Sequence, residues 1–421
     1  MNDDPNGNIF PKRFFWGAST SSHQVEGGTV NQWSVWELAH AKDLAQTAHQ
    51  RLGSLPNWDK IKAQAEDPSN YVSGRAVDHY HHFREDFQLA SSLGLNALRF
   101  GIEWSRIEPE EGSWNEEAIK HYKNYIADLR KQNLEPFLNI WHWTFPSWFS
   151  EKGGFKNSAN LKYFERFVAK VAEELIDDVT YIITINEPNV YASFSYGLGE
   201  WPPGEKNWLT FLRVYRNLTK VHNRAYKILK QHKPSAQIGV AQQLANIQAK
   251  RPHNVFDEVS TKWMRYFWNW WFINRIHRHQ DFVGFNYYFT DYYTGFLSRK
   301  NPKVPVSDLG WYMEPEGLYP LLVRTWVRFK KPIFITENGV ADANDQYRRW
   351  WIEESIVAME RAISEGVDLR GYFHWSLLDN FEWAYGWWPK FGLVAVDREN
   401  GMKRTIRPSA KWFAKRIKEV R

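Results

Sequence analysis

The chain has 421 residues, more than the roughly 100 to 200 of a typical domain. Some α/β domains nevertheless run past about 250 residues as one unit, so a single domain over residues 1–421 is the simplest prediction. Lys and Arg total 54 against 48 Asp and Glu, and the net charge of +6 is scattered rather than gathered into a patch, so no nucleic-acid partner is expected. The absence of cysteine excludes disulfides, thiolate metal sites and a cysteine nucleophile.

No targeting or membrane-spanning segment is evident in the sequence. The start, Met1–Pro5, lacks the basic and apolar regions of a signal peptide, and no run of 18 apolar residues follows. We therefore expect a cytoplasmic protein without a membrane partner. Its oligomeric state is not indicated.

Eight short β-like runs, each followed by an amphipathic stretch, make up most of the chain. The runs are rich in β-branched and aromatic residues and poor in charge, as expected of parallel strands buried on both faces. The predicted strands are Phe14–Thr20, Ala97–Trp104, Pro136–Trp143, Tyr181–Glu187, Gln237–Gln243, Phe282–Tyr288, Ile333–Glu337 and Gly371–Ser376. Helices are predicted between them, notably at His79–Leu93, Glu116–Gln132, Leu161–Leu175, Leu212–Gln231 and Trp350–Glu365. This alternation predicts a single (β/α)₈ TIM barrel with its active site at the C-terminal ends of the strands.

Two connections are long, residues 31–78 after the first strand and residues 290–320 after the sixth. Both leave the C-terminal ends of strands, where loops adjust substrate choice in barrels of this kind. The stretch Glu200–Gly204 is predicted as a loop after the fourth strand. An aromatic cluster recurs at helical spacing and is expected to fill the core; its members are Trp263, Phe267, Trp268, Trp270, Trp271 and Phe272.

Two glutamates stand at equivalent strand ends. The segment Thr184–Pro188, with Glu187, ends the fourth predicted strand, and Ile335–Gly339, with Glu337, ends the seventh. Taken alone, each is more often a turn with a charge in water, because Asn, Gly and Pro favour turns. Together, at the catalytic end of a barrel, two carboxyl groups can divide the cleavage of a glycosidic bond.

Further polar and aromatic residues lie at the same strand ends. They are Gln24, Arg99, His142, Asn186, Asn286, Tyr288 and Trp375, with Glu382 and Trp383 in the loop beyond the last strand. Amide, imidazole and carboxylate groups can bind several sugar hydroxyls at once, and an Arg and a Tyr beside one glutamate would hold it ionised as a nucleophile. Glu103 and Asp379 are also acidic and near strand ends, and we expect structural roles for them.

These residues lie in longer motifs, and through them the chain resembles glycoside hydrolase family 1, the β-glucosidase and β-galactosidase family of retaining (β/α)₈ barrels. The resemblance runs from about Phe10 to Lys418. Its motifs are Phe14–Gly27, Asp78–His81, Thr184–Pro188, Ile335–Gly339 and Trp375–Trp383.

The resemblance implies a role for each candidate residue. Glu187 would be the general acid/base and Glu337 the nucleophile, oriented by Arg99 and Tyr288. Asn186 would hold the 2-hydroxyl, the remaining hydroxyls would bind to Gln24, His142, Glu382 and Trp383, and Trp375 would floor the sugar ring. Asn286 is a further substrate-binding candidate. Trp311 would face the aglycone, and the segment Ala384–Gly392, which includes Phe391, has more aromatic bulk than is usual in the family and would narrow the mouth of the site.

The reaction so implied is hydrolysis of unphosphorylated β-D-glucosides, and also of β-galactosides and β-fucosides, through a covalent glycosyl-enzyme and without a metal or other cofactor. Small oligosaccharides and aryl or alkyl β-glycosides would be the substrates. Glu187 distinguishes the chain from the family's thioglucosidases, which lack the acid. Glu382 distinguishes it from the branch that cleaves 6-phosphoglycosides, which has a small hydroxyl residue there.

Three alternatives stay open. A metal-dependent barrel hydrolase would need His142 and the cluster of His79, His81 and His82 around an ion, although the spacing of that cluster favours a helix face. A catalytically silent sugar-binding barrel would have no need of both glutamates. A predominantly transglycosylating member of the same family would hold an acceptor on its aromatic mouth better than water.

Overall fold

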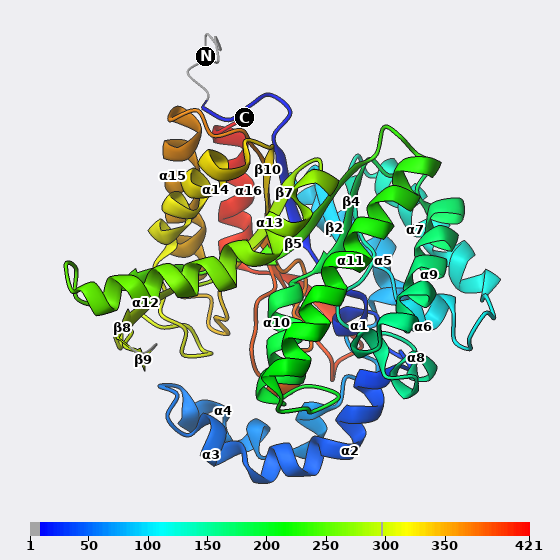
Figure 1. The fold of residues 1–421 in the computed structure, drawn as a ribbon, viewed down its shortest axis with the longest axis horizontal. Coiled ribbons are helices and arrows are strands. Elements are labelled where there is room, and N and C mark those ends of the chain that lie inside the picture. Colours follow the sequence, from blue (N-terminus) through cyan, green and yellow to red (C-terminus); the bar gives the residue numbers. More distant parts are fainter. Residues whose placement is uncertain (1–8, 296–297) are drawn as a thin grey trace.

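The computed structural model describes residues 9–295 and 298–421, and eight parallel strands in it close into a barrel (Figure 1). Neighbouring strands follow the order β1-β11-β10-β7-β5-β4-β3-β2, and Ser19 of β1 lies opposite both Arg99 of β2 and Trp375 of β11. The barrel strands are β1 (Phe15–Ser19), β2 (Ala97–Gly101), β3 (Glu135–Asn139), β4 (Tyr181–Asn186), β5 (Gln237–Gln243), β7 (Val283–Tyr287), β10 (Ile333–Asn338) and β11 (Leu369–Trp375). The predicted barrel is confirmed, although β2 and β3 end earlier than expected.

Helices follow the strands and cover the outside of the barrel (Figure 1). The long ones are α5 (His79–Ser92), α7 (Glu116–Lys131), α9 (Leu161–Leu175), α11 (Trp208–His232), α14 (Leu318–Phe329), α15 (Arg348–Ser364) and α16 (Pro408–Glu419). In α7 the Asn115 side chain caps the first turn by accepting from the Ala118 amide at 3.1 Å. Glu116 in its first turn and Arg130 in its last suit the helix dipole. All five predicted helices are present.

Aromatic side chains fill the barrel interior below the strand ends that carry the candidate site. Phe15, Phe137, Tyr181, Phe334 and Phe373 form one cluster with small residues between them. The rings of Phe137 and Tyr181 stack with centroids 4.3 Å apart. Phe137, Phe334 and Phe373 are buried, and each buried aromatic side chain contributes about 1.5–3 kcal/mol, so this floor is well packed.

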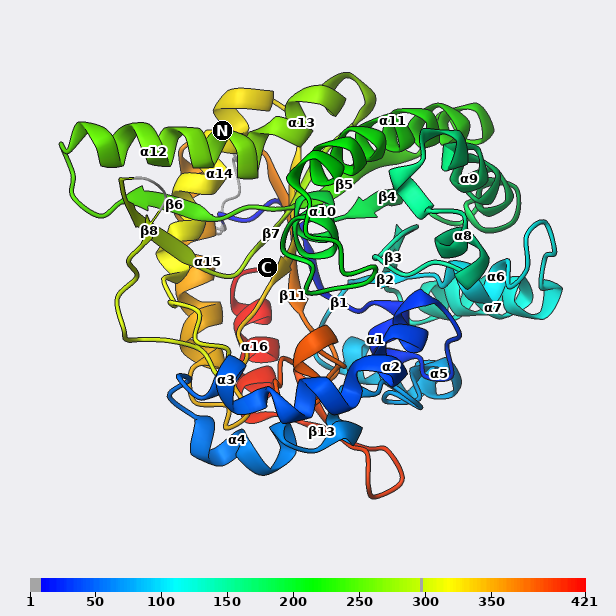
Figure 2. The same ribbon diagram turned by 60° about the horizontal axis from the view of Figure 1, so that its bottom comes forward.

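The connection over residues 31–78 folds into helices rather than an irregular loop. It contains α2 (Gln32–Gln46), α3 (Ala48–Leu52), α4 (Trp58–Ala65) and a 3₁₀ turn at Pro68–Tyr71, and Figure 2 shows α2 to α4 as a band along one side of the molecule. Asn31 and Ser34 begin α2 with reciprocal side-chain to backbone hydrogen bonds, both 2.9 Å. This capping box satisfies two amides that would otherwise lack partners.

The predicted core cluster after β5 is only partly buried. It spans α12 (Val255–Arg265), a π-helical turn (Tyr266–Trp270) and α13 (Trp271–Ile276). Trp270, Trp271 and Phe272 are buried, but Trp263 is exposed. The helical spacing is therefore confirmed, and the prediction that the whole cluster fills the core is wrong for Trp263.

The remaining elements are short. Helices α1 (Ser22–Val25), α6 (Trp104–Ile107), α8 (Ser147–Glu151) and α10 (Pro188–Ala192) follow barrel strands, and the small strands are β6 (Asn246–Ala249), β8 (Thr290–Thr294), β9 (Ser298–Arg299), β12 (Val394–Asp397) and β13 (Lys403–Ile406). Within residues 9–295 and 298–421, every helix is too short or too polar to cross a membrane.

Gly339 brings the end of β10 against the end of β11. A Cβ atom at this position would lie 1.9 Å from the Trp375 carbonyl oxygen. We predict that Gly339→Ala destabilises the fold by about 1–3 kcal/mol or more, because backbone rather than a flexible side chain must move. Urea denaturation measures this loss. Gly295→Ala is the matched control, since its new methyl would meet its nearest neighbour at 3.6 Å; equal losses in the two variants would contradict the prediction.

Candidate active site

Glu187 is the first residue after β4. Its φ of 40° lies in the left-handed region, which costs a residue with a side chain about 1–3 kcal/mol. The turn is held because the Glu187 amide donates to the Ala241 carbonyl at 2.7 Å and Pro188 begins α10 with a fixed φ. The backbone thus leaves the Glu187 carboxyl buried beside Asn286, whose Nδ2 donates to its Oε1 at 2.8 Å.

Glu337 lies near the end of β10 in a buried ion pair. Arg99 of β2 donates to its Oε1, and the Tyr288 hydroxyl donates to its Oε2 at 2.5 Å. The second terminal nitrogen of Arg99 donates to Asn186 Oδ1 at 2.6 Å. One guanidinium therefore connects the strand that carries Glu337 with the strand that precedes Glu187.

Asn286 links the surroundings of the two glutamates. Besides its hydrogen bond to Glu187, its Nδ2 donates to Asn186 Oδ1 at 3.2 Å. Its Oδ1 accepts from the hydroxyl of Thr336, the residue before Glu337, at 2.6 Å. The structure thus brings Arg99, Asn186, Glu187, Asn286, Tyr288 and Glu337 together as the strand-end positions predicted.

The two carboxyl groups differ in their affinity for a proton. Burial raises the pKa of Glu187 well above its usual value, and the charge of Glu337 raises it further. Burial also raises the pKa of Glu337, but the Arg99 charge and the Tyr288 hydrogen bond oppose that rise. Of the two carboxyl groups, Glu187 therefore binds a proton more readily than Glu337.

His142 and Asn186 form one wall of the site. β3 ends at Asn139, so His142 lies three residues beyond the strand rather than at its end as predicted. Its Nε2 is 3.0 Å from Asn186 Nδ2 and its Nδ1 is 3.2 Å from Asn139 Nδ2. Burial, assisted by the Arg99 charge, lowers the pKa of His142 far below its usual value. The imidazole is therefore neutral and can bind a sugar hydroxyl without adding charge.

The sequence analysis missed Trp143 as a site residue. Its indole Nε1 donates to the Asn186 carbonyl at 2.9 Å, and its φ of 75° is left-handed. Trp143 thus holds the backbone of Asn186 in place. Its position directly after His142 was the available signal.

The last strand and its loop supply an aromatic and acidic wall. The ring of Trp375, at the end of β11, lies 5.9 Å from the ring of His142. The ring of Trp383 lies 6.1 Å from the same imidazole, and both tryptophan rings are nearly parallel to it. Asn380 Nδ2 donates to Glu382 Oε2 at 2.8 Å. Burial raises the pKa of Glu382 to about 8 despite this hydrogen bond, and the Glu337 charge adds to the rise.

Gln24, in α1, fastens this loop to the start of the chain. The side-chain Nε2 of Gln24 donates to the Phe381 carbonyl at 2.7 Å. The backbone carbonyl of Gln24 accepts from the Phe381 amide at 3.0 Å. The Ser21 hydroxyl donates to its Oε1 at 2.6 Å. One amide hydrogen of Gln24 remains for a sugar hydroxyl.

Trp311 and Phe391 lie together in an aromatic collar around Tyr288. The ring of Tyr288 is 5.6 Å from that of Trp311 and 6.2 Å from that of Phe391. Leu55 and Trp58, from the 31–78 segment, belong to the same apolar cluster. The 31–78 segment therefore packs against the collar.

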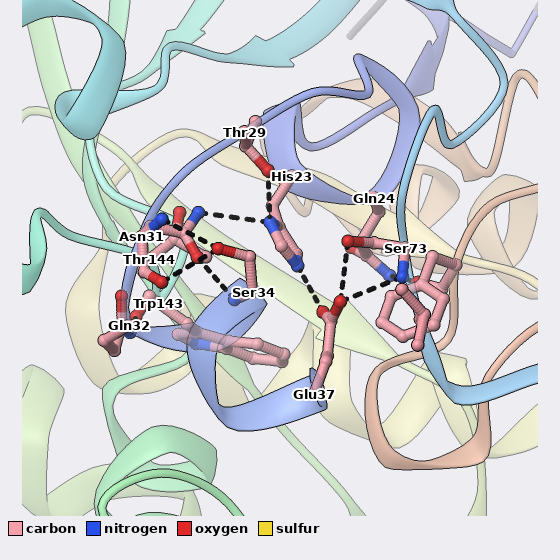
Figure 3. Close-up of polar contacts among 12 residues, drawn as sticks. His23, Gln24, Thr29, Asn31, Gln32, Ser34, Glu37, Ser73, Trp143 and Thr144 are labelled. Atoms are coloured by element: carbon pink, nitrogen blue, oxygen red, sulfur yellow. Dashed lines mark hydrogen bonds and ion pairs between the residues drawn. The ribbon is translucent and has the colours of Figure 1, made fainter. Parts of the chain in front are cut away.

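His23 of α1 and Glu37 of α2 form a buried hydrogen-bonded pair (Figure 3). His23 Nε2 is 2.7 Å from Glu37 Oε1, and Glu37 Oε2 accepts from both the amide and the hydroxyl of Ser73. The His23 ring stacks on the ring of Trp383, with centroids 5.6 Å apart and an angle of 15°. Through His23, α2 thus supports a residue of the predicted sugar site.

The other acidic residues near strand ends have protein partners. Glu103 accepts hydrogen bonds from the hydroxyls of Ser22, Ser105 and Thr144, at 2.9–3.0 Å. Asp379 forms a buried ion pair with Arg407 at 2.9 Å. These contacts agree with the structural roles expected for Glu103 and Asp379.

The histidines near the second strand do not converge on a point. His79 is buried between Asp86 and Tyr125, at 2.7 and 2.8 Å, while His81 contacts Asp78 at the start of α5 and His82 contacts Glu85. Across residues 9–295 and 298–421, no group of three or more His, Cys, Asp or Glu side chains could hold a metal ion.

Known proteins resemble this chain in sequence and fold. The family profile described as glycosyl hydrolase family 1 matches residues 6–281 and 273–420. Beta-glucosidase A of Acetivibrio thermocellus is 30% identical over 97% of this chain and 98% of its own length. A beta-galactosidase of Sulfolobus acidocaldarius is 30% identical over 92% of this chain and 91% of its own. The structure of a beta-glycosidase from Pyrococcus horikoshii superposes with a TM-score of 0.84, at 33% identity, covering 96% of this chain and 94% of that one.

A closed barrel that brings two buried glutamates together, and relatives that are β-glucosidases and β-galactosidases, define a β-glucosidase-like glycoside hydrolase. Because the profile covers nearly the whole sequence, the chain belongs to glycosyl hydrolase family 1.

The His23–Glu37 pair generates a prediction about stability. His23→Phe keeps a ring against Trp383 but removes the donor to a buried carboxylate, so we expect a loss of about 1–3 kcal/mol or more. Glu37→Gln removes the buried charge, which in His23→Phe retains only the Ser73 donors. The double variant should therefore unfold at higher urea concentration than His23→Phe alone. Additive losses would mean that the two side chains do not interact energetically.

Proposed function

We propose that this β-glycosidase is a retaining enzyme that hydrolyses unphosphorylated β-D-glucosides, and also β-galactosides and β-fucosides, through a covalent glycosyl-enzyme. Glu337 is the nucleophile and Glu187 the general acid/base. Small oligosaccharides and aryl or alkyl β-glycosides are its substrates.

The different surroundings of the two glutamates carry this proposal. Glu337 has a cation and a hydroxyl donor on its two oxygens, which favours the ionised form of a nucleophile. Burial and the negative charge of Glu337 favour the protonated form of Glu187, as an acid requires, and they outweigh the Asn286 amide donor, which favours the ionised form. The assignment therefore rests on local electrostatics as well as on the family motifs.

The first chemical step forms the intermediate. A carboxylate oxygen of Glu337 attacks the anomeric carbon while Glu187 donates its proton to the glycosidic oxygen, so the bond to the leaving group breaks and a glycosyl ester forms. This ester no longer carries the negative charge of Glu337. The pKa of Glu187 consequently falls, which suits its next role as a base.

The second step releases the sugar. Glu187 takes a proton from water, the water oxygen attacks the anomeric carbon, and the bond to Glu337 breaks. Each step inverts the anomeric centre, so the product keeps the β configuration. Glu187 ends protonated and Glu337 ends ionised, as both began.

The proposed preference for unphosphorylated sugars follows from the groups around Glu187 and Glu337. Neutral His142, the Asn186 amide and Glu382 offer donors and acceptors to hydroxyls without a cation that would bind a phosphate. A carboxyl at Glu382 instead repels a 6-phosphate when ionised. The names of the matched β-glucosidase and β-galactosidase support glucosides and galactosides as substrates.

Transfer to an acceptor other than water is the second candidate. The aromatic collar of Trp311, Phe391 and Tyr288 offers apolar ring faces on which a sugar or aryl alcohol can stack. An acceptor bound there competes with water for the glycosyl-enzyme.

Proton NMR of the anomeric signals during cleavage of 4-nitrophenyl β-glucoside, with EDTA present, tests the proposed function. We expect β-glucose first and α-glucose only later, through mutarotation. Early α-glucose would mean an inverting enzyme, in which Glu337 is not a nucleophile. If neither this glucoside nor the β-galactoside is cleaved, a silent binding barrel is favoured. Activity that is lost in EDTA would favour a metal-dependent enzyme. Signals of a new glycoside would favour transfer to an acceptor other than water.

The coupling of the two glutamates predicts a pH effect. Because the Glu337 charge raises the pKa of Glu187, Glu337→Gln should lower that pKa. Wild-type activity should fall as pH rises through the Glu187 pKa, since the acid is then deprotonated. A ¹³C NMR titration of labelled glutamate carboxyls, assigned with Glu187→Gln, measures the shift. An unchanged Glu187 pKa in Glu337→Gln would show that burial alone sets it.

A further inference from the structure

Helix α12 presents its apolar side to solvent and its polar side to the protein. The residues it buries are Asp257 and Thr261, whereas Val255, Phe256, Val259 and Trp263 are between 54% and 72% exposed. Asp257 faces inward because it pairs with Arg251 and accepts from the Gly295 amide at 2.8 Å. A surface helix ordinarily faces its core with the apolar side, so this orientation leaves a face without a partner.

The exposed residues form one continuous stripe, which we call the α12 stripe. Val255, Val259, Trp263 and Tyr266 are spaced by three or four positions, and Phe256 lies beside the first of them. The helix rests on β6 and β8 and extends to one edge of the molecule in both views, away from the band of α2 to α4 (Figures 1 and 2). Contiguous apolar surface of this kind marks a site of interaction.

A cationic cavity of about 490 Å³ adjoins the stripe, between the end of α12 and α14. Tyr266, Trp270, Val323 and Val327 supply its apolar lining. The other lining residues are all basic: Lys262, Arg265, Arg324 and Arg328. The cavity therefore combines aromatic and aliphatic walls with four positive charges.

These four cations lack ion-pair partners within the part of the chain that the structure describes. Arg328 donates to the Asn274 side chain and Arg265 to Thr261, both neutral, and Arg324 Nη1 is buried without a hydrogen bond. Burial lowers the pKa of Arg324, and repulsion by the Arg265 charge lowers it further. An anion in the cavity would offset this repulsion.

We propose that the α12 stripe and its cationic cavity dock on an anionic lipid surface. Aromatic residues on one side of a helix with Lys and Arg along its edge are typical of helices that lie at a membrane interface. A bilayer meets a protruding convex helix without a matching groove, and it supplies both acyl chains for the stripe and phosphates for the cavity.

A second copy of the chain fits this surface less well. Two copies related by a two-fold axis through this surface would each contribute the same four cations to one interface, and the excess of positive charge is unfavourable. Docking of this peripheral kind needs no spanning segment. The proposed docking differs from the sequence-based expectation of no membrane partner, because that expectation rested only on the absence of a spanning segment. The docking also does not depend on the chemistry proposed for the barrel.

Flotation of the full-length protein with vesicles tests the proposal. We expect binding to vesicles of phosphatidylcholine with about one-third phosphatidylglycerol, and at least about tenfold weaker binding to phosphatidylcholine alone. Binding should fall as salt rises, because the attraction of exposed charges is screened. Equal binding to both vesicles, or to neither, would overturn the proposal.

Two double variants assign the binding to this surface. Phe256→Ser with Trp263→Ser should lower binding about tenfold or more. Lys262→Gln with Arg328→Gln, both exposed, should lower it about 25-fold, since each basic residue near an anionic surface adds a factor of about five. All variants should cleave 4-nitrophenyl β-glucoside like the wild type, which shows that they are folded.

Matched controls test whether binding needs this surface or only exposed apolar and basic residues anywhere on the protein. Trp208→Ser removes a tryptophan as exposed as Trp263, and Lys411→Gln with Lys418→Gln removes two exposed cations of α16. Both controls should bind like the wild type, and losses equal to those of the α12 variants would overturn the proposal. Sedimentation showing a wild-type dimer that Phe256→Ser with Trp263→Ser dissociates, without vesicle binding, would assign the stripe to self-association instead.

Discussion

The buried ion pair between Arg99 and Glu337 is the constraint on which the site depends. A buried pair of this kind adds little net stability, because desolvation offsets most of the Coulomb attraction, but removal of one partner costs about 3–5 kcal/mol. Arg99 also binds Asn186 and lowers the pKa of His142. One guanidinium therefore fixes strand ends from β2, β4 and β10 relative to one another, and its charge opposes the rise that burial causes in the pKa of Glu337.

The sequence predicts the barrel well because parallel strands buried on both faces are visible as apolar runs. Polar residues at the ends of several such strands indicate a common site, because these ends lie together in a barrel. The sequence does not predict features that depend on contacts between distant segments. Helical spacing locates Trp263 on a helix, but only the pairing of Asp257 with Arg251 and Gly295 decides which side of α12 faces the protein. Glu37 lies in no motif, and its partner His23 is a neighbour only in the folded chain.

The helical segment over residues 31–78 acts on the sugar site through backbone as well as side chains. Gln32 donates to the Trp143 carbonyl at 2.8 Å and accepts from the Phe145 amide at 2.7 Å, so α2 holds the turn that follows His142. Near its middle the segment places Leu55 beside the aromatic collar. Variation in this one segment can therefore alter both the glycone and the aglycone sides of the site.

Three residues of the site, Trp143, Glu187 and Trp383, have φ values between 40° and 75°. Glycine adopts this conformation at little cost, whereas a residue with a side chain is strained in it. Replacement of Glu187 by glycine would thus relax the backbone and remove the proposed general acid in the same step. At this position thermal stability and turnover favour different residues, so a library of variants sorted only for resistance to heat would drift towards inactive barrels.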